Sequence, residues 1–260
     1  MISLGISTAS LYPMETEKAL EELGKNGIKN TEIFFNASIE LQKDFVRELK
    51  NIAEYYGVNI VSVHPTMSLA ESFMLFSAYD RRTAEGLSQY KRYGEIAGEL
   101  NAKYVIMHGG KPNGILNDFE YFERYLEIGE AVSSQGGILL QENVAKYRAG
   151  EIDFLVKMVE YLGDKAQLCL DIKQCIRNGY SPFEAMKKIG KNVRHLHVSD
   201  SNEAFDCMLP LKGKFDFSDF FELCRQMGYE GCALTEVYRT AYDSLGELFS
   251  SQRNFVAKIT

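Results

Sequence analysis

Histidine is scarce in this sequence, with four residues among 260, and cysteine is hardly more frequent, with five. The cysteines are odd in number and none has CxxC spacing, which argues against a disulfide framework or a zinc knuckle and suits a reducing cytoplasm. No stretch approaches the about 18 uninterrupted apolar residues of a membrane span, and the opening MISLGIST has no cationic region. We therefore expect a cytoplasmic protein that is neither exported nor inserted in a membrane.

Positive charge is also in deficit. The chain has 29 lysines and arginines against 36 aspartates and glutamates, a formal net charge of −7. Nucleic-acid-binding proteins usually carry a basic face that displaces counterions from phosphates, so we expect no nucleic acid as a partner. A local cationic site remains compatible with this balance.

Short runs rich in β-branched and aromatic residues alternate with longer stretches of helical periodicity. The predicted strands are 2–7, 31–35, 58–63, 104–107, 137–141, 167–170, 193–197 and 232–236. The predicted helices are 15–26, 40–56, 79–100, 117–134, 151–162, 182–189, 217–227 and 242–257. Several helices end in glycine directly before the next strand, as in YYGVNIVSV, which is a typical helix stop.

Eight strands each followed by a helix, at roughly 30 residues a unit, predict an α/β fold of the (β/α)8 barrel type. No Pro/Gly/Ser-rich linker or low-complexity tract divides the chain, so we predict a single domain over 1–260. An open doubly wound sheet is the alternative fold.

Two of the four histidines lie two residues apart in VRHLHVSD, residues 193–200. In a strand both would face the same side, with His197 nearer the carboxyl end and His195 deeper, as a core or supporting residue. Ligand-type side chains stand at the corresponding ends of six predicted strands: His64, His108, Glu142, Asp171, His197 and Glu236. A single buried histidine is more often a core residue, but six such positions around one barrel mouth predict a site.

Three carboxylates and one imidazole, from Glu142, Asp171, His197 and Glu236, make a hard ligand set that suits a divalent cation such as Mn²⁺, Mg²⁺, Co²⁺ or Zn²⁺. His64 and His108, with Glu142 bridging, fit a second, softer site for zinc. The same two imidazoles are equally suited to holding substrate hydroxyls.

The motifs LGISTASLYPM, VHPT, HGG, ENV, LDIK, HLHVSD and TEVYR run nearly from end to end of the chain. With them the sequence resembles the xylose isomerase-like barrel superfamily, which includes sugar and sugar-phosphate isomerases and epimerases, dehydratases and abasic-site endonucleases. The resemblance implies that Glu142 and Glu236 are the catalytic acid/base pair. It also implies proton transfer through a metal-stabilised enediolate.

Departures from the superfamily patterns narrow the choice. The endonucleases hold a third zinc with a histidine where this chain has Gln174 and with an Asp-x-His where it has Asp206, Cys207 and Met208. Two of those three ligands are therefore missing, which disfavours DNA incision. The ketohexose 3-epimerases carry a sugar-binding glutamate six residues past their strand-5 glutamate, where this chain has Arg148.

Cationic side chains follow several strand ends, and as a group they suggest a substrate with a phosphate or carboxylate. The predicted substrate-binding residues are Lys173, Arg148, Lys111 and Arg239, with Lys146, Arg177 and Lys212 in the same loops. We expect an isomerase or epimerase of an anionic ketose. The alternatives are a dehydratase, an abasic-site endonuclease and a non-catalytic binding barrel. The apolar FMLFSAY, residues 73–79, is expected to be a lid over the substrate or a contact in a homo-oligomer.

Overall fold

The computed structural model of the chain describes residues 2–66 and 70–259. Its strands form a closed parallel barrel in chain order, so that β1 pairs with β8. The strands are β1 (Ser3–Ser7), β2 (Asn30–Phe34), β3 (Asn59–His64), β4 (Tyr104–Met107), β5 (Ile138–Glu142), β6 (Leu168–Asp171), β7 (Val193–Val198) and β8 (Cys232–Thr235). The predicted (β/α)8 barrel is confirmed, and the open sheet is excluded because the sheet closes.

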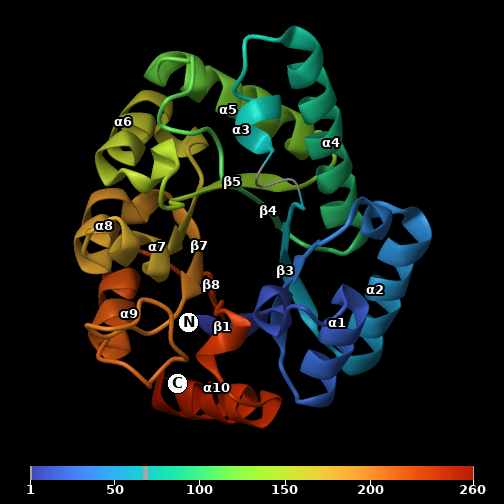
Figure 1. Cartoon of the computed structure of the whole chain (residues 1–260), viewed down its shortest axis with the longest axis vertical. Helices are drawn as coiled ribbons and strands as arrows, with labels where there is room; N and C mark the ends of the chain where they lie inside the picture. Colours follow the sequence, from blue (N-terminus) through green and yellow to red (C-terminus); the bar gives the residue numbers. More distant parts are fainter. Residues whose placement is uncertain (1, 67–69, 260) are drawn as a thin grey trace.

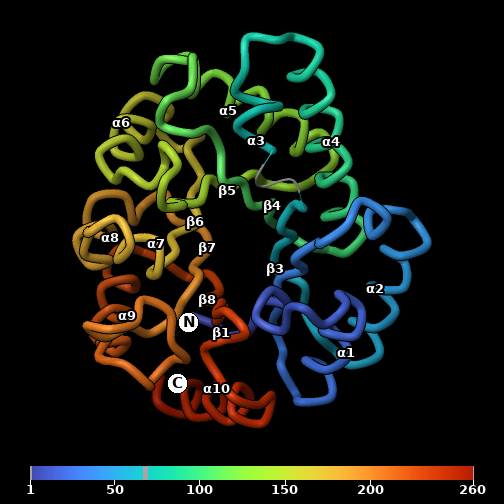
Figure 2. The backbone as a smooth tube through the Cα atoms, viewed as in Figure 1, coloured from blue at the N-terminus to red at the C-terminus, as the bar shows by residue number. Residues whose placement is uncertain are grey.

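Helices surround the strands in a ring, as Figure 1 shows. Those predicted are α1 (Thr16–Lys25), α2 (Lys43–Tyr56), α4 (Asp80–Glu99), α5 (Asp118–Ser133), α6 (Ile152–Leu162), α8 (Pro182–Ile189), α9 (Phe217–Gln226) and α10 (Leu245–Ile259). Two short helices were not predicted, α3 (Glu71–Met74), which lies between β3 and α4, and α7 (Ile172–Arg177), which follows β6 directly. The backbone tube runs once around the ring, so the last helix, α10, returns to the first strand (Figure 2).

Local signals explain where helices begin and end. Helix α5 starts at a capping box, in which the side chain of Asn117 accepts from the backbone N–H of Glu120 and the side chain of Glu120 accepts from the backbone N–H of Asn117. Helix α2 ends at Gly57, whose φ of 64° is the left-handed conformation that glycine adopts without steric cost. After Gly57 only Val58 separates this helix from the next strand, β3.

The core lies mainly between the strands and the helices, where the outward-facing strand residues meet the buried helix faces. Inside the barrel a smaller apolar cluster is formed by Tyr104, Ile106, Leu140 and Cys169. Above that cluster the interior becomes polar, with Glu32, Ser62 and His195 all fully buried. The polar layer leads toward the carboxyl ends of the strands.

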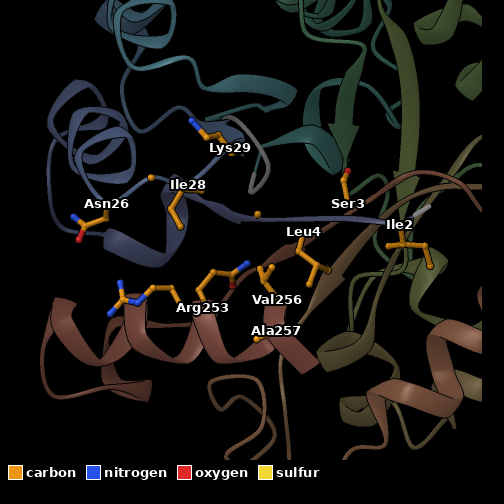
Figure 3. A pocket seen from close by; sticks show the side chains of 12 residues that line it. Ile2, Ser3, Leu4, Asn26, Ile28, Lys29, Arg253, Val256 and Ala257 are labelled. Carbon is orange, nitrogen blue, oxygen red and sulfur yellow. The ribbon is translucent and has the colours of Figure 1, made fainter. Parts of the chain in front are cut away.

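A pocket of about 580 Å³ lies at the opposite, amino-terminal end of the barrel, between β1, the segment 26–29 and the second half of α10. Figure 3 shows Leu4, Ile28 and Val256 turned toward one another across it, with the cationic side chains of Lys29 and Arg253 at its edges. Among the described residues, no helix combines the length and apolarity that a membrane crossing requires.

Candidate metal centre

Four side chains predicted as metal ligands converge at the barrel mouth. Each of Glu142, Asp171, His197 and Glu236 offers a ligand atom, and these atoms all lie within 4.8 Å of one another. Nδ1 of His197 is 3.3 Å from Oε1 of Glu142 and 3.3 Å from Oε2 of Glu236. Residues spread over nearly a hundred positions of sequence therefore share one small volume.

The strands place these ligands at one level. Glu142 and Asp171 are the last residues of β5 and β6, and Glu236 directly follows β8. In the β6–β7 register Asp171 is opposite His197. Asn143 fixes the aspartate, because its side chain accepts from the backbone N–H of Asp171 at 2.7 Å and donates to the backbone carbonyl at 3.1 Å.

The set fits a hard divalent cation. Oε2 of Glu142 and Oδ2 of Asp171 are buried and accept no hydrogen bond of good geometry from the described residues, although His108 and Lys173 lie 3.1 and 3.2 Å from them. A buried carboxylate oxygen without a donor is costly unless a cation compensates it. Together with the third carboxylate and the imidazole, these oxygens could coordinate Mn²⁺, Mg²⁺, Co²⁺ or Zn²⁺.

Glu32, in the middle of β2, supports the centre and was not among the predicted residues. Its fully buried carboxylate accepts from Ser7 at 3.2 Å and Ser62 at 2.8 Å, its register partners on β1 and β3. It also lies 3.2 Å from Nε2 of His197. A carboxylate on the far ring nitrogen fixes the tautomer that leaves Nδ1 free to bind a metal. The signal in the sequence was an acid inside the otherwise apolar run TEIFF.

Glu32 and His195 are both buried, but they differ in charge state. Burial opposes ionisation of Glu32, but the charge and hydrogen bond of His197 outweigh it and lower the pKa of Glu32 to about 2. Burial and the charge of His197 lower the pKa of His195 to about 3, so His195 is neutral. Nε2 of His195 is 3.5 Å from the hydroxyl of Ser62, one layer below the ligands, where the sequence predicted a core or supporting residue.

The ligand carboxylates differ in their ionisation. Burial raises the pKa of Asp171 to about 7, with the ammonium of Lys173 lowering it and the charges of Glu236 and Glu142 raising it further. Burial also acts on Glu142, but the imidazoles of His108, His197 and His64 hold the pKa of Glu142 well below its usual range. The centre thus concentrates negative charge that a cation would stabilise.

His64 and His108 meet on the other side of Glu142. Their Nε2 atoms are 2.9 Å apart, and they lie 3.7 and 3.1 Å from Oε2 of Glu142. All three groups offer ligand atoms within 4.8 Å of one another, as the predicted second site requires. The ring of His64 stacks on Phe34 at 4.4 Å between centroids, which fixes its orientation. This geometry is compatible with a second metal or with substrate hydroxyls.

A cavity of about 200 Å³ opens beside Glu236. It is lined by Ala9, Tyr12, Phe34, Asn36, Lys173, Glu236, Val237 and Tyr238. The cavity has aromatic walls and two charged groups, as is typical of sites for small molecules, where apolar faces bind the ligand and a few polar atoms fix its orientation. Of the four predicted substrate-binding residues, only Lys173 lines this cavity.

The other three predicted substrate-binding residues lie elsewhere. Arg148 forms an ion pair with Asp118 and donates to the backbone carbonyl of Leu116. Arg239 donates to the carbonyl of Tyr242 at 2.6 Å, within its own loop. The ammonium of Lys111 lies 3.4 Å above the ring of Tyr147, which packs edge-on against His108. Lys173 therefore contacts the predicted metal ligands directly, whereas Lys111 reaches the second predicted site only through Tyr147.

Gln174, which departs from the endonuclease pattern, and Asp206, which keeps to it, both have partners in the loops. Oε1 of Gln174 accepts from the backbone N–H of Ala145 at 3.0 Å and so joins the loops after β5 and β6. Asp206 accepts from Nε of Arg177 at 2.5 Å and from Nη2 at 3.1 Å. These side chains stabilise the loops around the mouth.

The fold and the site define a (β/α)8 barrel whose mouth carries acidic and histidine clusters able to hold a metal. The chain belongs to the xylose isomerase-like TIM barrel family, whose model matches residues 18–257. It is 24% identical to fructoselysine 3-epimerase of Escherichia coli O157:H7, over 95% of this chain and 94% of that protein.

Solved structures share the fold. A D-tagatose 3-epimerase-like protein superposes with a TM-score of 0.81 at 18% identity, over 99% of this chain and 97% of the other. The 3-keto-D-glucoside 4-epimerase of E. coli superposes with a TM-score of 0.79 at 14% identity, over 99% of this chain and 100% of the other.

Proposed function

We propose that this protein is a divalent-metal-dependent sugar epimerase or isomerase that acts on a ketose. The observation that carries the proposal is the convergence of Glu142, Asp171, His197 and Glu236 within 4.8 Å. Further support comes from the family and from the epimerases among the similar proteins, which act on sugars according to their names. A binding barrel without catalysis would not require a complete ligand set beside a cavity.

Glu142 and Glu236 are the proposed acid/base pair. They project from β5 and β8, on either side of His197, and Glu236 lines the 200 Å³ cavity. A bound cation would polarise the carbonyl and hydroxyl oxygens of the ketose and so acidify the C–H bond beside them. One carboxylate then removes that proton, and the other returns a proton from the opposite face, which inverts the carbon. If the same carboxylate instead returns the proton to the neighbouring carbon, the reaction is an isomerisation.

We also propose that the ketose carries an anionic group, a phosphate or a carboxylate, held by Lys111. The ammonium of Lys111 stacks on Tyr147 beside His108, and no ion pair engages it within residues 2–66 and 70–259. Lysine recognises such anions by charge-assisted hydrogen bonds. Replacing Lys111 with methionine should raise KM for a phosphorylated ketose and leave KM for its neutral counterpart unchanged. Equal effects on both substrates would contradict this part.

The test of the main proposal is exchange of a substrate proton with solvent. Purified protein, stripped by chelation and reloaded with Mn²⁺, Mg²⁺, Co²⁺ or Zn²⁺, is incubated in D₂O with neutral and phosphorylated ketoses and followed by proton NMR. Metal-dependent deuterium incorporation at the inverted carbon supports the proposal. Loss of water from the sugar would indicate a dehydratase instead. Incision of an abasic duplex, or turnover that chelation leaves intact, would refute the proposal.

A further inference from the structure

Lys173 lies inside the ligand set rather than at its rim. Its ammonium nitrogen is 3.2 Å from Oδ2 of Asp171 and 3.2 Å from Oε2 of Glu236. The side chain of Lys173 is only 3% exposed, against 1% for Asp171 and 15% for Glu236. Oδ2 of Asp171 is one of the two buried oxygens without a hydrogen bond of good geometry, and Oε2 of Glu236 is the oxygen 3.3 Å from Nδ1 of His197. Lys173 therefore occupies a position where a cation is needed.

The charges at the mouth explain why a lysine is stable there. Glu142, Asp171 and Glu236 bring three carboxylates into a few ångströms, and an unpaired ammonium or carboxylate at this depth would be costly. Ion pairing with Lys173 offsets part of that repulsion within the protein itself. A divalent ion at the same oxygens would offset it too, and it would repel the ammonium at this distance.

We propose that Lys173 is an exchangeable counter-cation, which pairs with Asp171 and Glu236 in the metal-free protein and releases them when a divalent ion binds. This inference rests on the metal site of the proposed function. The 200 Å³ cavity gives the ammonium room to move away from the carboxylates, because Lys173 lines it together with Tyr238, whose ring centre is already 5.3 Å from the nitrogen. Metal binding is then an exchange of one cation for another, and it leaves the lysine facing the cavity.

The test compares Lys173→Met with wild type in two measurements, the Kd for Mn²⁺ by titration calorimetry and the Tm with EDTA or with saturating Mn²⁺. Removal of the competing ammonium should tighten Mn²⁺ binding by about 5- to 150-fold, the usual range for coupling between two ligands. The Tm in EDTA should fall, while the Tm in Mn²⁺ stays near the wild-type value. The stabilisation by Mn²⁺ should therefore be larger in the variant.

Lys111→Met is the matched control, because it removes the same charge from the same mouth without contact to a ligand carboxylate. Its Kd for Mn²⁺ should stay within about twofold of wild type, since an exposed charge in solvent couples weakly. Lys173→Arg retains the cation and should keep the metal-free Tm above that of Lys173→Met.

Several outcomes would overturn the inference: unchanged or weaker Mn²⁺ binding by Lys173→Met, or a loss of Tm that is the same with and without the ion. If Lys173→Met does not fold in EDTA, recovery of folded protein on adding Mn²⁺ supports the exchange, and failure to recover overturns it. A wild-type protein that binds no divalent ion would instead remove the proposed metal site. The two failures are therefore distinguishable.

Discussion

The two ends of the barrel differ in what they enclose. At the amino-terminal end a pocket of about 580 Å³ is lined mainly by apolar side chains such as Leu4, Ile28 and Val256 (Figure 3). At the carboxyl end the cavity beside Glu236 has only about 200 Å³, but buried acids and histidines converge next to it. The larger pocket is the usual first candidate for a ligand site. Here buried charge locates the functional site better than pocket volume does, because burying charged groups costs free energy unless a partner or a metal compensates them.

The largest loss of activity should come from replacing Glu236, the proposed catalytic carboxylate at the carboxyl end. Glu236→Gln keeps the shape of the side chain but cannot accept a proton, so the ketose exchange rate should fall by about 100- to 10,000-fold. Deuterium incorporation under saturating Mn²⁺ measures the loss. Residual activity near the wild-type level would exclude Glu236 as an acid or base.

Replacing Glu32, which supports the ligand His197, should have a smaller effect, on the affinity for Mn²⁺. Glu32→Gln removes the charge that holds Nε2 of His197, 3.2 Å away. Loss of such an outer carboxylate weakens metal affinity by about 10- to 100-fold. Titration calorimetry with Mn²⁺ measures it.

The control for Glu32 is Glu71→Gln. Glu71 is equally buried, but its carboxylate accepts from Tyr90 and from the backbone N–H of Gly109 instead of contacting His197. Its Kd for Mn²⁺ should stay within about threefold of wild type. Equal losses in both variants would show a general effect of buried charge and would contradict the role of Glu32.

The convergence of the candidate metal ligands was predictable because it follows from the order of the strands in the barrel. Parallel strands in βα units bring their carboxyl ends to one mouth, so Glu142, Asp171 and His197 must meet there once the strands are placed. The strand boundaries were correct to within about a residue, since glycine stops such as Gly57 fix where helices end. Errors of that size leave the order around the barrel unchanged.

Contacts across the barrel and within loops were not predictable in the same way. Helix α7 begins directly after Asp171, and this short helix turns Lys173 back toward the ligands. The position of Arg148 against Asp118 depends on how the loop after β5 packs on α5. Such placements follow from tertiary packing, which local sequence patterns do not specify.

At the amino-terminal end, substitutions should change stability rather than activity. A Cβ at Gly5 would lie 2.0 Å from the carbonyl oxygen of Asn30, so Gly5→Ala should lower the free energy of unfolding by about 1 to 3 kcal/mol. Urea denaturation measures it, and the folded fraction should keep its kcat.

Gly129→Ala is the control for Gly5. Gly129 lies within α5, and no atom is within 4 Å of its added Cβ. It should raise stability by about 0.5 to 1 kcal/mol, because alanine loses less backbone entropy in a helix. A loss of kcat in Gly5→Ala beyond its loss of folded protein would contradict the division between the two ends.

The smallest effect should come from filling the 580 Å³ pocket itself. Ala257→Leu adds apolar volume where Ala257 lines that pocket, at the opposite end of the barrel from Glu236. Exchange rate and Mn²⁺ affinity should stay within about twofold of wild type, because substitutions at sites without shared partners act independently. Asn254→Leu makes a similar addition on an exposed part of α10 that does not line the pocket. A tenfold loss of exchange rate or Mn²⁺ affinity in Ala257→Leu but not in Asn254→Leu would mean that the pocket is energetically coupled to the site at the mouth. The buried charge at the mouth would then mark only one of two functional regions.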